Sequence, residues 1–488
     1  MRYQGVMIVP PPALLADLAG LLGPAGYSDD PAVLAPWLTD WRGRYHGTTA
    51  ALLSPASTNQ VAAVVRLANA YRVPLVAQGG NSSTVGGATP PADGSALLLS
   101  LRRMARPPVI DTGDAAATVD AGVILSDLHD AAAAHGLRFP LSLAARGSAT
   151  IGGLVSTNAG GIQVLRFGTM RALVLGLEAV LPDGTIFHGL SSLRKDNRGY
   201  DLRQLLTGAE GTLGIVTAAT LRLVPAIGSR SVAWVALPDP QSALRLLRRL
   251  DGALGDAVES FELIPATGLD LVLHHIPATR SPVAPTAPWH VLIEATAPHG
   301  APEPADTLAA ALQSALEDGL ILDATIAASE AHAEALWKLR ETLPEAERLD
   351  GFAVKHDIAV PVSAMPDFIV DTTSAIEATY NGARVLAFGH LGDGNVHFNV
   401  RAPAGRDSAA WSAAHGPAVS RDVHDRVMAV GGTISAEHGI GQAKLAEFAR
   451  TADPVRLATL RAIKTALDPL NLFNPGKLVP LAPQRTGP

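Results

Sequence analysis

Two histidines flank a glycine-rich turn in the run Leu386-Ala-Phe-Gly-His-Leu-Gly-Asp-Gly-Asn-Val-His-Phe-Asn-Val400. A Gly-Asp-Gly-Asn sequence between two apolar stretches predicts a β-hairpin. His390 closes the first predicted strand and His397 lies in the second, so the imidazoles can converge at one end of a sheet. Side-chain alternation places His397 and Asn399 on one face of that strand and Phe398 on the other.

A third metal ligand is available in Ser435-Ala-Glu-His-Gly-Ile-Gly441, where Glu437 and His438 are neighbours among small residues. Two imidazoles and a carboxylate with open positions suit Zn²⁺, Mn²⁺ or a similar divalent ion. The alternative is that His390 and His397 only form hydrogen bonds inside a buried hairpin and that His438 is a surface histidine. The residues by themselves leave both interpretations open.

Composition excludes several classes of protein. The 488 residues contain no cysteine, which rules out disulfides, thiolate nucleophiles, iron–sulfur clusters and Cys-type zinc sites. The formal net charge is −7 and no basic run occurs, so we expect no nucleic-acid partner. No segment approaches about 18 uninterrupted apolar residues, and the start of the chain lacks the character of a signal peptide. We therefore expect no membrane span and a cytoplasmic location.

The length predicts at least two domains, and the pattern of elements indicates an α+β protein. We predict a nucleotide-binding domain over residues 1–228 and a second, substrate-binding domain with an antiparallel sheet covered by helices over 229–434. Residues 435–488 are predicted to form a helical segment that returns to the first domain. The clearest predicted elements are the helices 59–71, 240–250, 305–317 and 453–467 and the strands 74–78, 96–101, 174–181, 231–237 and 290–295.

A glycine-rich loop follows the predicted strand 74–78, in Pro74-Leu-Val-Ala-Gln-Gly-Gly-Asn-Ser-Ser-Thr-Val-Gly-Gly87. Without Cβ atoms, its backbone N–H groups can approach a pyrophosphate closely. The spacing fits neither the Rossmann nor the Walker pattern. A flexible surface loop is the alternative interpretation of this segment alone.

Two further segments are also rich in glycine and small residues. They are Gly147-Ser-Ala-Thr-Ile-Gly-Gly-Leu-Val-Ser-Thr-Asn-Ala-Gly-Gly161 and Gly208-Ala-Glu-Gly-Thr-Leu-Gly-Ile215. Together with the first loop they resemble the FAD domain of vanillyl-alcohol oxidase type flavoproteins. The run Ser191-Ser-Leu-Arg-Lys-Asp-Asn-Arg-Gly-Tyr-Asp-Leu202 is similar to D-2-hydroxyglutarate dehydrogenases, within a family that also includes D-lactate dehydrogenases. The resemblance extends from about Trp37 to Lys477.

The resemblance implies FAD as cofactor, bound without a covalent link because neither His nor Cys stands at the tethering places. The first loop would hold the pyrophosphate, and the later segments would line the flavin ring and ribityl chain. The implied contacts are Gly79, Gly80, Asn81, Ser82, Gly86, Pro140, Gly147, Ser148, Gly152, Gly153, Thr157, Asn158, Gly161, Ile215 and Asn474.

The same resemblance implies that His390, His397 and Glu437 bind the metal. It implies Asn399 as a substrate contact and His438 as the catalytic base that also touches the substrate. Arg340, on a predicted helix, and Lys355, on the strand after it, offer charges for carboxylates and match the family's substrate anchors. A solvated helix arginine is the alternative for Arg340. Relatives acting on hydroxyglutarate can carry a hydroxyl residue four positions after the arginine, where this chain has Pro344.

We therefore predict an FAD- and metal-dependent dehydrogenase that oxidises D-2-hydroxyglutarate to 2-oxoglutarate. The family implies an electron-transfer flavoprotein or a quinone as acceptor, and a homodimer formed through the second domain is an open option. The nearest alternative is a D-lactate or other D-2-hydroxy acid dehydrogenase. More remote alternatives are a flavin-carrying electron-transfer subunit without catalysis and a metal-dependent hydrolase.

Overall fold

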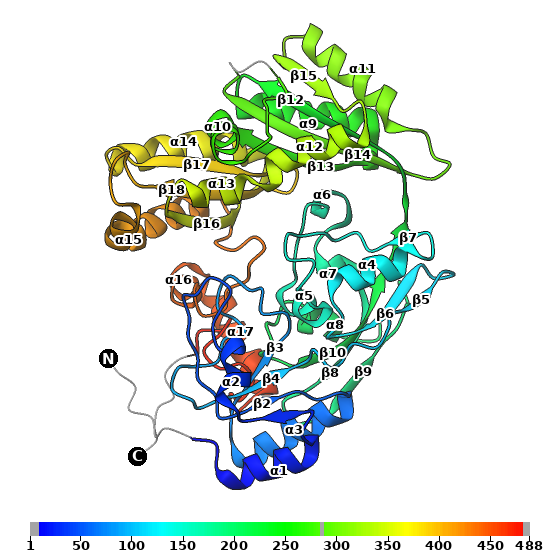
Figure 1. The fold of residues 1–488 in the computed structure, drawn as a ribbon, viewed down its shortest axis with the longest axis vertical. Coiled ribbons are helices and arrows are strands. Elements are labelled where there is room, and N and C mark those ends of the chain that lie inside the picture. Colours follow the sequence, from blue (N-terminus) through cyan, green and yellow to red (C-terminus); the bar gives the residue numbers. More distant parts are fainter. Residues whose placement is uncertain (1–8, 284–286, 482–488) are drawn as a thin grey trace. The chain divides into compact units, whose positions relative to one another are not determined.

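The computed structural model describes residues 9–283 and 287–481 (Figure 1). Most of the segment on which the signal-peptide interpretation depends, residues 1–8, lies outside this range. Contacts divide the described chain into two units. The first contains residues 9–160, 169–225 and 437–481, and the second contains residues 161–168 and 226–436. The short segment 161–168, which the sequence analysis counts with the first domain, thus lies in the second unit.

The first unit is built from short strands and helices, with a four-stranded sheet and a five-stranded sheet as its main layers. Its strands are β1 (Tyr27–Ser28), β2 (Leu52–Leu53), β3 (Leu75–Gln78), β4 (Leu97–Ser100), β5 (Val109–Asp111), β6 (Ala116–Asp120), β7 (Leu137–Arg138), β8 (Val174–Val180), β9 (Ile186–Gly189), β10 (Ile215–Arg222) and β11 (Val224–Pro225). Its helices are α1 (Pro12–Leu22), α2 (Pro31–Leu34), α3 (Thr58–Tyr71), α4 (Leu125–Ala133), α5 (Ile151–Thr157), α7 (Met170–Leu173), α8 (Leu202–Leu206), α16 (Leu445–Thr451) and α17 (Pro454–Leu467).

The smaller sheet has the order β1-β2-β4-β3, and β4 runs parallel to both of its neighbours β2 and β3. Helix α3 connects β2 to β3 and corresponds to the helix predicted over 59–71. It begins where the side chain of Ser57 accepts a hydrogen bond from Gln60 N. Its apolar face buries Val61 and Val65 against Leu75 and Leu97 of the sheet. The larger sheet, β5-β6-β10-β8-β9, is antiparallel throughout.

The end of the chain is part of the first unit. After α17 the chain pairs with β3, where Leu75 N donates to Leu472 O and Asn474 N donates to Leu75 O. Lys464 and Asp468 form a buried ion pair at 2.5 Å, and the Asp468 carboxylate also accepts the backbone N–H of Phe473. These bonds hold the residues around Asn474 beside the strand that precedes the glycine-rich loop.

The second unit has one seven-stranded antiparallel sheet. Its strands are β12 (Ile227–Leu237), β13 (Val258–Pro265), β14 (Trp289–Pro298), β15 (Asp323–Ile326), β16 (Ala353–Ala359), β17 (Arg384–His390) and β18 (Asn395–Arg401). Its helices are α6 (Val164–Phe167), α9 (Pro240–Leu254), α10 (Ala266–His275), α11 (Pro304–Glu317), α12 (Glu330–Glu341), α13 (Leu343–Leu349), α14 (Met365–Thr379) and α15 (Ser408–Ala429). The strand order is β15-β12-β14-β13-β17-β18-β16.

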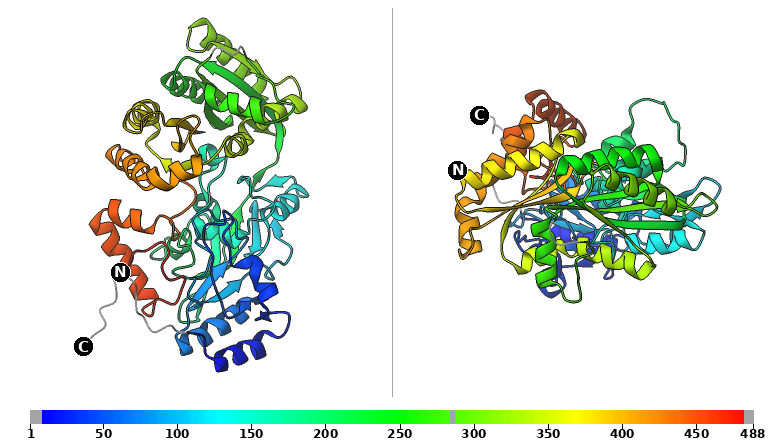
Figure 2. Two further views of the ribbon diagram at one scale, coloured as in Figure 1. Left: turned by 60° about the vertical axis from the view of Figure 1, so that its left-hand side comes forward. Right: turned by 90° about the horizontal axis from the view of Figure 1, so that it is seen from above.

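Helices cover both faces of this sheet, as the right-hand view of Figure 2 shows. One core lies under α9, α11, α14 and α15 and includes Phe261, Ala387 and Phe398. The other lies under α10, α12 and α13 and includes Leu386 and Phe388. Because neighbouring residues of β17 fall in different cores, the strand alternates faces as the sequence pattern predicts. The predicted α+β class with an antiparallel sheet is confirmed.

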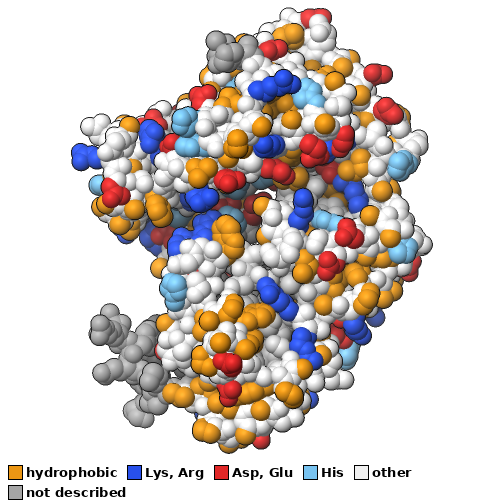
Figure 3. Space-filling view, in the orientation of Figure 1, with side chains coloured by type: hydrophobic (Ala, Val, Ile, Leu, Met, Phe, Trp, Pro, Cys, Tyr) orange, Lys and Arg blue, Asp and Glu red, His pale blue; other side chains and the backbone are white. Residues whose placement is uncertain are grey.

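Charges of both signs are mixed over the surface. On the face drawn in Figure 3, Lys and Arg side chains lie interspersed with Asp and Glu side chains. That mixture differs from the continuous basic surface on which nucleic acid binds. Within the described residues, every helix is too short or too polar to cross a membrane.

Candidate active site

The predicted hairpin is present as β17 and β18, and its register fixes where the histidines lie. His390 pairs directly with Asn395, and His397 pairs with Phe388 two positions away along the strands. The turn needs glycine at position 394, where φ is +80° and an added Cβ would lie 2.1 Å from Val360 O. Because directly paired residues and residues two apart in a strand share a face, this register places both imidazole rings on one face of the hairpin, with their centroids 5.8 Å apart.

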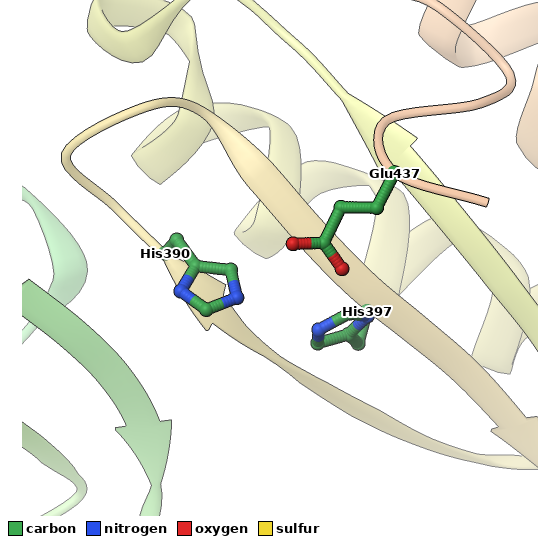
Figure 4. A group of neighbouring side chains, drawn as sticks. All are labelled: His390, His397 and Glu437. Carbon is green, nitrogen blue, oxygen red and sulfur yellow. The ribbon is translucent and has the colours of Figure 1, made fainter. Parts of the chain in front are cut away.

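Glu437 completes a group of three ligands with these histidines. The potential ligand atoms of His390, His397 and Glu437 all lie within 4.8 Å of one another, and Figure 4 shows the three side chains pointing toward one another. A second group of the same kind consists of Asp357, Glu437 and His438. Two imidazoles and a carboxylate form a donor set that fits Zn²⁺ or Mn²⁺. The sequence-predicted ligands are therefore brought together.

A carboxylate that the sequence analysis missed lies directly behind His390. Glu262, on β13, is the cross-strand partner of His390 and is almost completely buried. Its Oε1 accepts a hydrogen bond from His390 Nδ1 at 2.5 Å, and its Oε2 accepts one from Arg340 Nε at 2.8 Å. Because Nδ1 is engaged, Nε2 is the His390 nitrogen that can bind a metal.

The electrostatics around Glu262 favour its ionised form. Burial by itself raises the pKa of this carboxyl group, but the charges and hydrogen bonds of His390 and Arg340 outweigh burial and lower the pKa to about 2. The Arg340 guanidinium also lies 5.1 Å from the centre of the Phe388 ring. Arg340 is thus held in place from two sides, and only its Nε is used by Glu262.

Lys355 and Asn399 are direct cross-strand partners on β16 and β18. Both contact a second buried carboxylate that sequence reasoning missed. Glu347, on α13, lies 2.6 Å from Lys355 Nζ through its Oε2, which also accepts a hydrogen bond from Asn399 Nδ2 at 2.9 Å. The two predicted substrate anchors, Arg340 and Lys355, are therefore each paired with a buried glutamate.

The loop that carries His438 belongs to the first unit, where a buried acid holds it in place. The Glu210 carboxylate accepts the backbone N–H groups of Ile440 and Gly441, each at 2.8 Å. Burial raises the pKa of Glu210, although these two hydrogen bonds act in the opposite direction. Gly441 lies against Val85 of the glycine-rich loop, whose carbonyl would be 2.4 Å from an added Cβ. The predicted base therefore belongs to a loop that is anchored on the predicted cofactor loop.

The glycines of the predicted phosphate loop are required by close packing within the first unit. A Cβ on Gly79 would lie 2.2 Å from Thr150 Oγ1, and one on Gly80 would lie 2.0 Å from Ser148 O. Asn81 has φ of +55° and donates its side-chain amide to Thr39 O. The loop and the second glycine-rich segment thus lie side by side in close contact.

The second segment forms the short helix α5. Gly152 packs so closely against Ala121 that an added Cβ would lie 2.7 Å from its methyl group. Asn158 ends the helix with φ of +49°, and its Oδ1 accepts the N–H of Arg171 at 2.8 Å. The Thr157 hydroxyl donates a hydrogen bond to Gly153 O. This arrangement leaves the segment compact and rich in small residues, as a flavin-lining segment requires.

Several buried polar side-chain atoms in the described part of the first unit lack hydrogen-bond partners, and two of them belong to residues that contact the first glycine-rich loop. These two atoms are Thr150 Oγ1 and Asn474 Oδ1, while Asn474 Nδ2 donates to Gly87 O and Glu210 O. A glycine-lined cradle with buried acceptors and donors left over fits a dinucleotide cofactor. Of the other implied FAD contacts, Pro140 follows β7, Ile215 begins β10 and Gly161 opens the segment of the second unit. The remaining ones, Ser82, Gly86, Gly147 and Ser148, lie in the two glycine-rich loops.

Comparisons with known proteins agree with this architecture. Residues 49–189 match the FAD binding domain family, and residues 228–478 match the C-terminal domain family of FAD linked oxidases. Among solved structures, p-cresol methylhydroxylase covers 95% of this chain and 96% of its own with a TM-score of 0.70 at 14% identity. An alkyldihydroxyacetonephosphate synthase covers 97% and 87% with a TM-score of 0.70 at 16% identity. The fold and these domains define an FAD-dependent oxidoreductase of the vanillyl-alcohol oxidase type.

Curated relatives narrow the class. The D-2-hydroxyglutarate dehydrogenase of Xanthomonas citri is 39% identical over 450 residues, which is 92% of this chain and 93% of the relative. The mitochondrial D-2-hydroxyglutarate dehydrogenase of Bos taurus is 37% identical over 468 residues, covering 95% and 83%. The chain therefore belongs to the D-2-hydroxyglutarate dehydrogenase family of FAD-linked oxidoreductases.

Proposed function

We propose that the protein oxidises D-2-hydroxyglutarate to 2-oxoglutarate, with FAD and a divalent metal held by His390, His397 and Glu437. The observation that carries the proposal is the convergence of these three ligands, whose donor atoms lie within 4.8 Å of one another. The relatives named D-2-hydroxyglutarate dehydrogenase support the choice of substrate.

Several polar residues of the site have a role in this reaction. FAD, held by the glycine-rich loops, would supply the hydride acceptor, and the metal, held by His390, His397 and Glu437, would supply Lewis acidity toward the 2-hydroxyl group. His438 takes the hydroxyl proton, which makes it the general base. The two terminal amino groups of Arg340, which Glu262 does not use, bind a substrate carboxylate, and Asn399 contacts the substrate. The protein's own contribution is orientation of the acid beside the base.

FAD binds without a covalent link in this proposal, because the glycine-rich loops contain neither His nor Cys. Zn²⁺ and Mn²⁺ are the ions that the donor set favours. Three further features stay predictions. They are an electron-transfer flavoprotein or a quinone as electron acceptor, a homodimer, and a cytoplasmic location. On location the relatives differ, since the cattle and Arabidopsis proteins are named mitochondrial and the Xanthomonas protein is not.

A second candidate is the oxidation of D-lactate or another D-2-hydroxy acid without a second carboxylate. The pairing of Lys355 with Glu347 favours it, because this cation already has a carboxylate partner. Pro344 favours it too, because it offers no hydroxyl group to a distal carboxylate.

The test is anaerobic bleaching of the flavin absorbance by D-2-hydroxyglutarate, with D-lactate, D-malate and the L-enantiomers in parallel. We expect rapid bleaching by the D-acid that is lost after treatment with a chelator and restored by Zn²⁺ or Mn²⁺. Preference for D-lactate would select the second candidate. A flavin that none of these acids bleaches would overturn the dehydrogenase proposal, and a purified protein without flavin would point to the hydrolase alternative.

A further inference from the structure

The segment of residues 161–168 belongs to the second unit, although the residues on both sides of it belong to the first. The chain leaves the first unit after Gly160 and returns to it at Thr169. Gly161, which opens the segment, is the last of the implied flavin contacts in the second glycine-rich segment. Since none of the proposed metal ligands or substrate anchors lies among these residues, the place of the segment calls for another explanation.

A buried hydrogen-bond network holds the segment on the sheet of the second unit. Arg166 Nη1 donates to Thr296 Oγ1 of β14 at 2.7 Å and lies 3.3 Å from Glu259 Oε2 of β13. Thr296 donates its hydroxyl to the same Glu259 oxygen at 2.6 Å, and both residues are 1% exposed. Ile162 O accepts the hydroxyl of Ser260 at 3.0 Å. A buried, charge-assisted network of this kind makes the segment rigid.

The same segment packs against the turn of the hairpin that carries the proposed metal ligands. A Cβ on Gly392 would lie 2.7 Å from Leu165 Cδ1 and 2.9 Å from Leu165 Cδ2, so the leucine rests directly on the backbone of the turn. Gly392 lies between His390 and His397 in the chain. The position of the turn is therefore tied to the position of Leu165.

Strand β13 supplies a second connection between the segment and the hairpin. Glu259, which holds Arg166, and Glu262, which accepts a hydrogen bond from His390 Nδ1, both lie on this strand. In the proposed reaction a hydride moves between a carbon held at the metal and the flavin. The distance between these two groups matters, because a misplacement of about 1 Å can lower a rate about 100-fold.

Resting on the proposed function, we propose that Leu165 and Arg166 are positioning residues for hydride transfer. They hold Gly161, at the flavin-lining end of the segment, at a fixed distance from His390. Leu165 acts through the turn at Gly392, and Arg166 acts through Glu259. Loss of either contact therefore slows reduction of the flavin while FAD and the metal stay bound.

The first test is Leu165→Ala, which removes the contact with Gly392. We expect the rate of flavin reduction by a saturating concentration of the preferred D-2-hydroxy acid to fall about 10- to 100-fold, with flavin content and Zn²⁺ affinity unchanged. Leu244→Ala is the matched control, because Leu244 is also a partly buried leucine packed against the same core. Both variants should lose thermal stability, but only Leu165→Ala should lose rate. Equal rates in the two variants would overturn the role of Leu165.

Thr296 gives access to the other contact. Thr296→Val keeps the shape of the side chain but removes the hydroxyl that joins Arg166 to Glu259, so flavin reduction should again be slower. Thr296→Ser keeps the hydroxyl and should restore the rate. A loss of rate that serine does not rescue would assign the effect to packing and overturn the role of Arg166, as would a normal rate in Thr296→Val.

Hydrogen exchange tests the coupling without turnover, in the flavin-loaded protein. Zn²⁺ bound at the hairpin should slow amide exchange of residues 161–168, and Leu165→Ala should lose this slowing whereas Leu244→Ala keeps it. If no D-2-hydroxy acid bleaches the flavin, the proposed function fails, and the exchange result then decides by itself whether the segment is coupled to the hairpin. Exchange of residues 161–168 that Zn²⁺ leaves unchanged in the unaltered protein would overturn the inference.

Discussion

Glu262 and His390 are direct cross-strand partners on β13 and β17, joined by a hydrogen bond of 2.5 Å from His390 Nδ1 to the Glu262 carboxylate. The same carboxylate accepts Arg340 Nε at 2.8 Å. One buried acid therefore orients a proposed metal ligand and a proposed substrate anchor together. Partners of this kind fix the ring orientation of a metal-binding histidine and raise its basicity.

Replacing Glu262 by Gln should weaken metal binding about 10- to 100-fold. The amide has one acceptor oxygen, so it cannot accept hydrogen bonds from both His390 and Arg340 as the carboxylate does. Zn²⁺ affinity is measured by competition with a chelator in the flavin-loaded protein. The control is Glu341→Gln, an exposed glutamate on α12. Equal Zn²⁺ affinity in the two variants would show that Glu262 does not support the ligand.

Replacing His438 by Ala should lower the rate of flavin reduction about 10²- to 10⁴-fold, because a general base contributes that much. The proposed FAD contacts are untouched, so the bound flavin absorbance should stay normal. Single-turnover reduction under anaerobic conditions measures the effect. His299→Ala, at an exposed histidine, is the control. Reduction at a near-normal rate would remove His438 as the base.

Replacing Gly80 by Ala should release FAD. The added Cβ would lie 2.0 Å from Ser148 O and 3.1 Å from Ala149 Cα, so the two glycine-rich segments would have to separate. The fraction of protein that retains flavin after gel filtration measures the loss. In Gly252→Ala the new methyl group meets nothing within 4 Å, and full flavin content is expected there. Retention of flavin by Gly80→Ala would place the cofactor elsewhere.

Replacing Gly441 by Ala should reduce turnover more than stability. The residue has φ of +49°, and the new Cβ would lie 2.4 Å from Val85 O, which displaces the loop carrying His438. Gly405→Ala is matched for backbone strain, with φ of +76°, but its Cβ meets nothing within 4 Å. Both variants should lose about 1 kcal/mol of stability from the left-handed conformation. Loss of kcat only in Gly441→Ala is expected, and equal kcat in both would contradict the anchoring role.

The hairpin and the glycine-rich loops were predictable because their signals are local. The Gly-Asp-Gly-Asn turn between alternating residues determines where His390 and His397 lie, and the strand-to-glycine transition after Gln78 marks the predicted cofactor loop. These signals need no knowledge of the rest of the chain. The structure confirms the hairpin and its face alternation.

Glu262 and Glu347 were not predictable in the same way. Glu262 lies 128 residues before His390, and its role depends on the register of β13 against β17. Sheet order is not encoded in local periodicity, so a charged residue in a strand is read as facing solvent. The apolar run around Glu262, Val258-Glu-Ser-Phe-Glu-Leu-Ile-Pro265, does contain one usable signal. Carboxylates inside a strand that is buried along its whole length need partners, which points to a site.

The stability of the second unit should fall as pH is lowered from 6.5 toward 4, and His290 accounts for part of that loss. His290 lies on β14 with 2% of its surface exposed, near the ring of Trp234, and burial lowers its pKa from 6.5 to about 4. Below pH 6.5 His290 becomes protonated in the unfolded chain, whereas in the folded protein it stays neutral until about pH 4. The full contribution is therefore present above pH 6.5, and up to about 3 kcal/mol is lost over this window.

Urea unfolding at pH 7, 6, 5 and 4 measures this dependence. In His290→Leu the free energy of unfolding should fall less steeply with decreasing pH, because the group that titrates differently in the two states is gone. His299→Leu, at an exposed histidine, should keep the pH dependence of the unaltered protein. If His290→Leu also keeps it, the imidazole takes up its proton in the folded state near its ordinary pKa, and the buried position on β14 must then open to water under acid conditions.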